Sequence, residues 1–176
     1  MALVEFPTES ELKQMDFPDT HHLSSAIGWL ELGNAAEALS ELERISTTAR
    51  NDAATLEVRW KILAAQERWD EAVIVAREHV RVAPDDTGGW INCSFALHEL
   101  RHTAEARAEL LPAAKKFLEE PIVPYNLACY ACQLGDMESA RRWFDEAVKR
   151  GGKQKMKAMA LDDPDLAPMK EEIQKL

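Results

Sequence analysis

Two cysteines spaced as Cys-x-x-Cys, Cys129 and Cys132, are the residues in this chain whose types and spacing most directly suggest chemistry. Such spacing is found in zinc sites and in thiol redox centres. A structural zinc ion takes four ligands, so His98 or Cys93 would have to complete the set. The pair lies in NLACYACQLG, a predicted mid-helix segment, and no basic residue within one turn could lower a thiol pKa. We therefore interpret both cysteines as small apolar residues in a tight helix contact, and we predict no metal site and no cofactor.

The search for other catalytic groups gives no candidate for an active site. We find no GxSxG sequence, no glycine-rich phosphate loop and no protein-kinase signature. His21 and His22 are adjacent, and adjacent side chains point to different sides of a helix. Acidic and basic residues alternate over 138–146, which is typical of a solvated helix face. We predict that the protein is not an enzyme.

Charge and composition narrow the choice of partner. The chain has 31 acidic and 21 basic residues among 176, a net charge of −10, which disfavours binding to phosphate backbones. Its apolar runs never approach the roughly 20 residues that span a bilayer. The start, MALVEFPTESEL, lacks the basic region of a secretory signal, and three cysteines are too few for a disulfide framework. We expect a cytoplasmic protein that binds neither nucleic acid nor membranes.

Helical periodicity runs through the whole chain, and the alternation typical of strands is not sustained anywhere. In the segment 69–82, for example, Trp69, Val73, Ala76 and Val80 fall on one helix face. The sequence therefore predicts an all-α protein.

A repeat of 34 residues organises these helices. Its clearest marker is an alanine that recurs at this interval (Ala38, Ala72, Ala106 and Ala140). Five residues before each alanine the chain must reverse (Gly33, Glu67, Arg101 and Gly135). Twelve residues before it, three of the four side chains are small (Ala26, Trp60, Ser94 and Ala128). Small residues facing each other let two antiparallel helices approach closely, so each copy is predicted to be a helix hairpin that buries its faces by stacking.

These copies resemble the tetratricopeptide repeat family in their 34-residue period and in the segments ERWDEA (67–72), VAPDD (82–86) and QLGDMESARRWF (133–144). The resemblance implies a right-handed α-solenoid of four hairpins, about 21–52, 53–86, 87–120 and 121–153. An N-terminal arm (1–20) and a C-terminal pair of capping helices (154–176) complete the predicted organisation. First helices are predicted near 21–32, 53–66, 87–100 and 122–134, and second helices near 35–48, 69–82, 103–117 and 137–149.

Three residues depart from the family pattern. Arg59 stands where the family prefers leucine, and Trp60 stands where it prefers a small residue. Pro112 lies inside the second helix of the third copy, where we expect a kink or a shorter helix. His79 replaces an apolar residue and is expected to be buried and hydrogen-bonded.

The resemblance implies a protein that binds other proteins, because the first helices of such arrays line a concave groove. The family's groove positions fall on six residues of this sequence (Lys61, Asn92, Phe95, His98, Tyr125 and Asn126). Asn92 and Asn126 are 34 residues apart and could hold a peptide backbone through donor and acceptor. We predict a non-catalytic scaffold that binds a peptide or a partner helix there.

Two alternatives stay open. The chain also resembles small acidic repeat chaperones that hold secretion or assembly substrates, and a cysteine-based metal or redox site is the third possibility. The family's clamp for a C-terminal carboxylate is absent, because its positions hold apolar residues (Leu23, Ile27, Val58 and Ile122). The identity of the partner and the oligomeric state stay open.

Overall fold

The computed structural model describes residues 16–176, and every regular element in this range is a helix. These residues belong to two compact units, divided between Ala96 and Leu97, and each unit is described by itself. The first unit contains α2 (Asp19–Glu31), α3 (Ala35–Glu43), α4 (Ala53–Ala65), α5 (Trp69–Val82) and most of α6 (Thr87–Glu99). The second contains α7 (Thr103–Lys116), α8 (Ile122–Gln133), α9 (Met137–Gly151), α10 (Lys153–Leu161), the 3₁₀ helix η1 (Pro164–Met169) and α11 (Lys170–Lys175).

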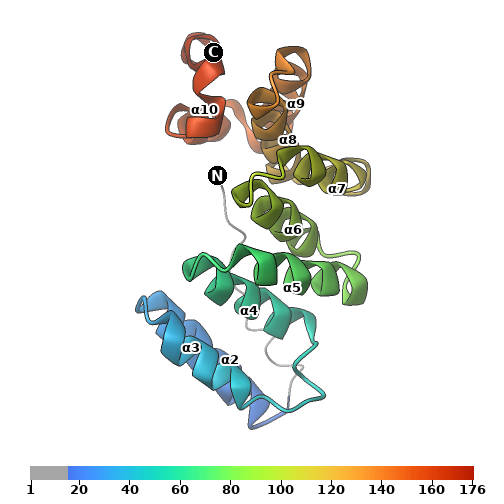
Figure 1. The fold of residues 1–176 in the computed structure, drawn as a ribbon. Coiled ribbons are helices and arrows are strands. Elements are labelled where there is room, and N and C mark those ends of the chain that lie inside the picture. Colours follow the sequence, from blue (N-terminus) through green and yellow to red (C-terminus); the bar gives the residue numbers. More distant parts are fainter. Residues whose placement is uncertain (1–15) are drawn as a thin grey trace. The chain divides into compact units, whose positions relative to one another are not determined.

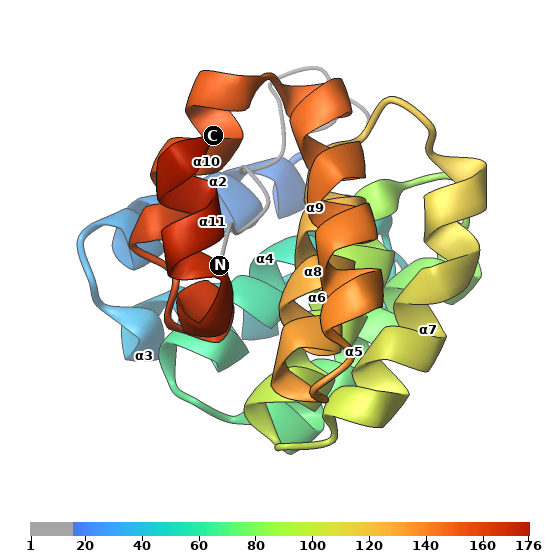
Figure 2. The same cartoon turned by 90° about the horizontal axis from the view of Figure 1, so that it is seen from above.

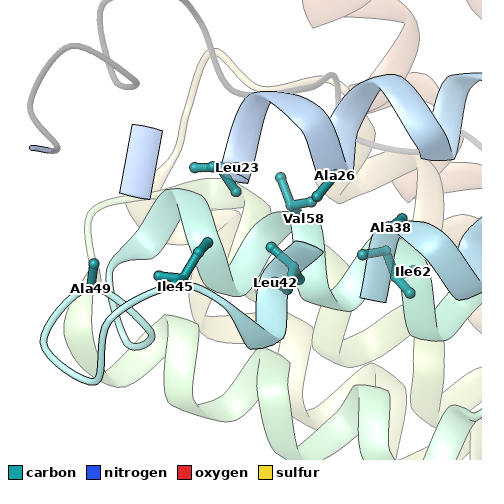
Figure 3. Close-up of a cluster of buried hydrophobic side chains, with 8 residues drawn as sticks. All are labelled: Leu23, Ala26, Ala38, Leu42, Ile45, Ala49, Val58 and Ile62. Carbon is teal, nitrogen blue, oxygen red and sulfur yellow. The ribbon is translucent and has the colours of Figure 1, made fainter. Parts of the chain in front are cut away.

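In the first unit, consecutive helices form hairpins that pack on one another. Helices α2 and α3 lie side by side, and α4 packs against both of them (Figure 1). Their apolar side chains meet in one cluster (Figure 3), whose fully buried members come from all three helices (Leu23, Ala26, Ala38, Leu42, Val58 and Ile62). Helix α5 then pairs with α4 to form the second hairpin.

The second unit repeats this arrangement and ends in residues 153–176, which we call the closing segment. Helices α8 and α9 lie side by side as a hairpin (Figure 2), and α7 packs against α8. The 3₁₀ helix η1 packs on α8, and α10 packs on α9. The predicted pair of closing helices is therefore present, but the second begins as a 3₁₀ helix, since it contains Pro168, which cannot donate a backbone hydrogen bond.

The 34-residue repeat marks equivalent buried places in all four hairpins. The four recurring alanines are completely buried, and the residues twelve before and four after each alanine are buried as well (Ala26, Trp60, Ser94, Ala128, Leu42, Ala76, Leu110 and Phe144). The same repeat positions are therefore buried in all four copies, as the repeat predicts.

Each hairpin turns through a residue in the left-handed backbone region. Gly33, Glu67, Arg101 and Gly135 have φ angles of 76°, 55°, 66° and 77°. In each hairpin the next residue donates its N–H to the carbonyl five residues back, at 2.9 Å (Asn34 to Trp29, Arg68 to Leu63, His102 to Leu97 and Asp136 to Ala131). These bonds satisfy carbonyls that the helix end would otherwise leave unpaired.

The structure corrects one predicted helix length and agrees with another. Helix α3 ends at Glu43 rather than near residue 48, and Arg50 explains part of the difference, because its Nη2 bonds the Glu43 carbonyl at 2.8 Å. Helix α7 runs through Pro112 to Lys116, close to the predicted range of 103–117, so of the two expected effects of Pro112 the shortening does not occur. Most of the predicted N-terminal arm, residues 1–15, lies outside the described residues, and residues 19 and 20 already belong to α2.

Candidate functional site

The six residues predicted to bind a partner all lie on first helices of the hairpins. Lys61 is on α4, three are on α6 (Asn92, Phe95 and His98) and two are on α8 (Tyr125 and Asn126). The first unit contains Lys61, Asn92 and Phe95, and the second unit contains His98, Tyr125 and Asn126.

In the first unit, Lys61 and Phe95 are engaged within the protein. Lys61 Nζ contacts Glu57 Oε1 at 2.8 Å, and both side chains are about nine-tenths buried. Burial raises the pKa of the Glu57 carboxyl, although the bond from Lys61 acts in the opposite direction. The Phe95 ring packs between Trp60 and Trp69, with ring centroids 5.8 and 5.6 Å away. The tryptophan at a position that is usually small is thus accommodated by an aromatic cluster.

Asn92 and Asn126 share an unusual environment. Their side chains are 1% and 0% exposed, and neither the amide nitrogen nor the amide oxygen of either residue has a hydrogen-bond partner among the described residues. A buried polar group without a partner costs roughly 1–3 kcal/mol. Two amides at equivalent repeat positions therefore keep donors and acceptors that the fold itself does not use.

In the second unit, His98 and Tyr125 bind the closing segment of the chain. Tyr125 donates its hydroxyl to Asp163 Oδ2 at 2.9 Å, and the Cys129 thiol lies 3.8 Å from the same oxygen. His98 Nε2 is 3.1 Å from Asp165 Oδ2. Because a carboxylate only accepts, this His98 nitrogen carries a proton, and Nδ1 forms a hydrogen bond with the Thr103 hydroxyl at 3.0 Å.

Local sequence explains why the two aspartates reach these partners. Asp163 precedes Pro164 and caps η1, since its Oδ1 accepts the backbone N–H of Asp165 at 3.0 Å. Gln133, in the last turn of α8, donates to the Asp165 carbonyl at 3.0 Å. The start of η1 is thereby fixed along one face of α8. We call this set, Tyr125, Cys129, Asp163, Asp165 and His98, the closing cluster.

Burial and nearby negative charge keep two hydrogen-bond donors of the closing cluster, Tyr125 and Cys129, in their protonated forms. Burial raises the pKa of Tyr125, and the nearby Cys129 and Asp163 add to this effect. Burial also raises the pKa of the Cys129 thiol well above its usual value, with Asp163 contributing. Both groups therefore act as neutral hydrogen-bond donors to Asp163.

The closing cluster also contains potential metal ligands. Cys129, Asp163 and Asp165 each place one ligand atom within 4.8 Å of the others. Of the zinc ligands considered from the sequence, this group contains Cys129 but not Cys132, Cys93 or His98. Among the described residues the group offers three ligands, one fewer than a structural zinc site takes, and both carboxylates already accept hydrogen bonds from Tyr125 and His98. The arrangement fits a hydrogen-bond network better than a metal centre.

The absence of catalytic motifs inferred from the sequence is wrong in one respect. Residues 98–102 read His-Glu-Leu-Arg-His, the H-E-x-x-H spacing of zinc proteases. In those enzymes both histidines lie on one face of a continuous helix, but here α6 ends at Glu99 and Arg101 has a φ of 66°. His98 is buried against Asp165, whereas His102 is an exposed residue in the turn before α7. The helix end separates the two histidines, so the motif forms no zinc site here.

Comparison with solved structures identifies the architecture. MamA MSR-1 C2 superposes with a TM-score of 0.66 at 21% identity, over 81% of this chain and 84% of that one. TTC0263, a thermophilic TPR protein of Thermus thermophilus, superposes with a TM-score of 0.67 at 18% identity, over 94% and 86%. The chain has the fold of tetratricopeptide-repeat proteins.

A second MamA structure, MamA RS-1, agrees, with a TM-score of 0.69 at 15% identity over 81% of this chain and 80% of that one. No model of a protein family matches the sequence, and no curated protein matches it. The predicted fold class of a tetratricopeptide-type helical repeat is confirmed by these superpositions. In the described part of the chain, no helix combines the length and the apolar character needed to cross a membrane.

Proposed function

We propose that this protein is a non-catalytic scaffold whose first helices bind a peptide segment or a helix of a partner protein. The tetratricopeptide-type fold supports this function, because stacked hairpins offer their first helices as an extended binding surface. The observation that carries the proposal is the pair of unpartnered amides of Asn92 and Asn126. An asparagine can both donate to and accept from the backbone of a bound segment.

The closing cluster gives independent support for binding of this kind. Two of the six residues, His98 and Tyr125, already bind the acidic start of η1 in the protein's own chain through Asp165 and Asp163. These first-helix side chains therefore have the chemistry to bind a peptide segment. Because Asn92 and Asn126 are covered, a partner reaches them only when neighbouring side chains move aside.

The test separates binding from folding at the two amides. A partner is first identified by crosslinking to the full-length chain in cells, and its affinity is then measured by calorimetry for Asn92→Leu and Asn126→Leu. Leucine has nearly the same volume and no polar atom, so thermal stability should stay the same or rise. Affinity should fall by about tenfold or more for each variant, since a hydrogen-bonded contact is lost.

Asn51, an exposed asparagine outside the first helices, provides the matched control, and Asn51→Ala should leave both quantities unchanged. Partner affinity that stays within twofold of the wild type in both leucine variants would show that the amides take no part in binding.

A further inference from the structure

Arg59 is a charged residue at a repeat position that is otherwise uncharged. The equivalent residues at intervals of 34 are Ser25, Cys93 and Leu127, and the last two are buried. Arg59 lies on α4 and is half-buried. The second hairpin therefore places a guanidinium where the other copies place a small or apolar side chain.

The Arg59 guanidinium has an unused hydrogen-bonding edge. Its Nε is buried and has no partner among the described residues. Arginines elsewhere in the chain use Nε together with Nη2 to bind a carboxylate side-on. Arg68 binds Glu71 with both distances at 2.7 Å, and Arg141 binds Glu172 in the same way. Arg59 has the same fork but no carboxylate in it.

Arg59 is one of the residues that line a hollow of about 260 Å³ between α3, α4 and α5. Its apolar walls come from all three helices (Leu39, Leu63, Ile74 and Val75). Three further charged residues line it, of which Arg68 and Glu71 pair with each other. The third, Glu43, forms no ion pair with Arg59 within 4.0 Å, so the charge of Arg59 has no close counterpart in the hollow.

We propose that this hollow binds an aspartate or glutamate side chain of a partner protein, with a neighbouring aliphatic side chain packed on Ile74. Charge complementarity selects a carboxylate for Arg59. Ile74, which lines the same hollow, is 69% exposed and so is available to pack on a partner, and arginine is among the residues enriched at protein interfaces. The hollow is smaller than the roughly 300–1,000 Å³ of small-molecule pockets, which favours an anchor side chain over a separate ligand.

None of the residues of this site belongs to the six first-helix residues of the proposed function. A failure of binding at Asn92 and Asn126 therefore leaves this proposal standing, and the reverse also holds.

Nuclear magnetic resonance of the ¹⁵N-labelled full chain tests the site directly, since it resolves arginine Nε–H signals. The probes are acetyl-Ala-Leu-Glu-Leu-Ala-amide and the same peptide with glutamine in place of glutamate. We expect the Arg59 Nε–H signal, assigned from its loss in Arg59→Lys, to shift saturably with the glutamate peptide. A single charged anchor predicts a dissociation constant on the order of 1 mM, and binding of the glutamine peptide should be about tenfold weaker.

Three variants accompany the titration. Arg59→Leu should abolish the saturable shifts around Ile74, whereas Arg81→Gln, at an exposed arginine of α5 paired with Glu78, should retain them. Glu43→Gln should retain or strengthen binding, because it removes a carboxylate that competes for Arg59.

Equal shifts with both peptides, or no shift of the Arg59 signal at about 10 mM peptide, a tenfold excess over the expected constant, would overturn the proposal. Loss of binding in Glu43→Gln would also overturn it. A change of the Arg59 signal on dilution without peptide would instead assign the hollow to a second copy of this chain, which likewise contradicts a separate partner.

Discussion

At the scale of single residues, Asp163 determines how the end of the chain is attached. Its carboxylate accepts from Tyr125, lies within reach of the Cys129 thiol and caps η1 through the Asp165 N–H. The side chain is 5% exposed, so these donors replace water almost completely. Loss of the carboxylate would leave several buried donors without an acceptor.

We predict that Asp163→Ala lowers the free energy of unfolding by about 2–4 kcal/mol, because buried donors lose a charged acceptor. Tyr125→Phe removes one hydrogen bond but leaves Asp163 buried, and should cost about 1–3 kcal/mol. The double variant should be less destabilised than the sum of the two, since both changes remove the same bond. Urea denaturation of the three variants measures this coupling, and strictly additive effects would contradict the network.

The raised pKa values of Tyr125 and Cys129 predict a loss of stability in alkali. A group whose pKa is raised by folding contributes stability below its unfolded pKa, and that contribution declines as the pH rises above it. The unfolded values are near 10 for tyrosine and 9 for cysteine, so the decline should begin at about pH 9. Denaturation midpoints from pH 7 to 11 should fall less steeply in Tyr125→Phe combined with Cys129→Ala, and an unchanged slope would contradict the assignment.

Arg59 offers a prediction about stability that is separate from its binding role. Arg59→Leu restores the apolar residue that the repeat pattern favours and removes a buried Nε–H without a partner. We expect the free energy of unfolding to rise by about 1–2 kcal/mol, measured by urea denaturation. A decrease would show that Arg59 already has a stabilising partner in the folded chain.

At the scale of helices and turns, the four hairpins form the same type of turn with different residues. Gly33 and Gly135 adopt the left-handed conformation without steric cost, whereas Glu67 and Arg101 adopt it with a side chain. A Cβ atom in this region approaches the following carbonyl oxygen, which destabilises the turn. The second and third hairpins therefore have less favourable turns than the first and fourth.

We predict that Glu67→Gly and Arg101→Gly each stabilise the protein by about 0.5–1 kcal/mol, which corresponds to roughly 1–4 °C in melting temperature for a chain of this size. Gly33→Ala and Gly135→Ala should have the opposite sign. Calorimetric melting of the four variants gives the comparison. If all four changes lowered the melting temperature, turn geometry would not explain the choice of residues.

The same elements show what the sequence could and could not predict. The spacing of Ala38, Ala72, Ala106 and Ala140 located the second helix of each copy, because each alanine lies on such a helix and is fully buried. The binding site could not be predicted in the same way, because the sequence of a first helix looks the same whether its polar residues face solvent or another segment of the chain. His98 and Asp165 are 67 residues apart in the sequence, and no local sequence pattern predicts a contact of this kind.

At the scale of the whole molecule, the many acidic residues determine how the stability of the folded state depends on pH. Several carboxylates have lowered pKa values because they accept hydrogen bonds, among them Asp19 from Ser46, Glu41 from His22 and Asp136 from Ser139. Such groups stabilise the folded state above their unfolded values of 3.8 for aspartate and 4.5 for glutamate. Glu57, whose pKa is raised by burial, opposes this trend.

We therefore expect the urea midpoint to fall as the pH is lowered from about 5 to 3, where these carboxylates become protonated. Replacing Asp19 with asparagine should make the decline shallower, because one of the contributing groups is removed. A midpoint that stays constant down to pH 3 would mean that the hydrogen-bonded carboxylates contribute no net stability.

The closing segment also affects whether further copies of the protein can stack on its last hairpin. Because η1 packs on α8 and α10 packs on α9, the last hairpin already has its neighbours from its own chain. A repeat array that ended in a bare hairpin would present an adhesive end on which further copies could polymerise into filaments. The Asp163–Asp165 attachment acts against such end-to-end growth, and a chain with a weakened attachment would be the one to examine for fibre formation.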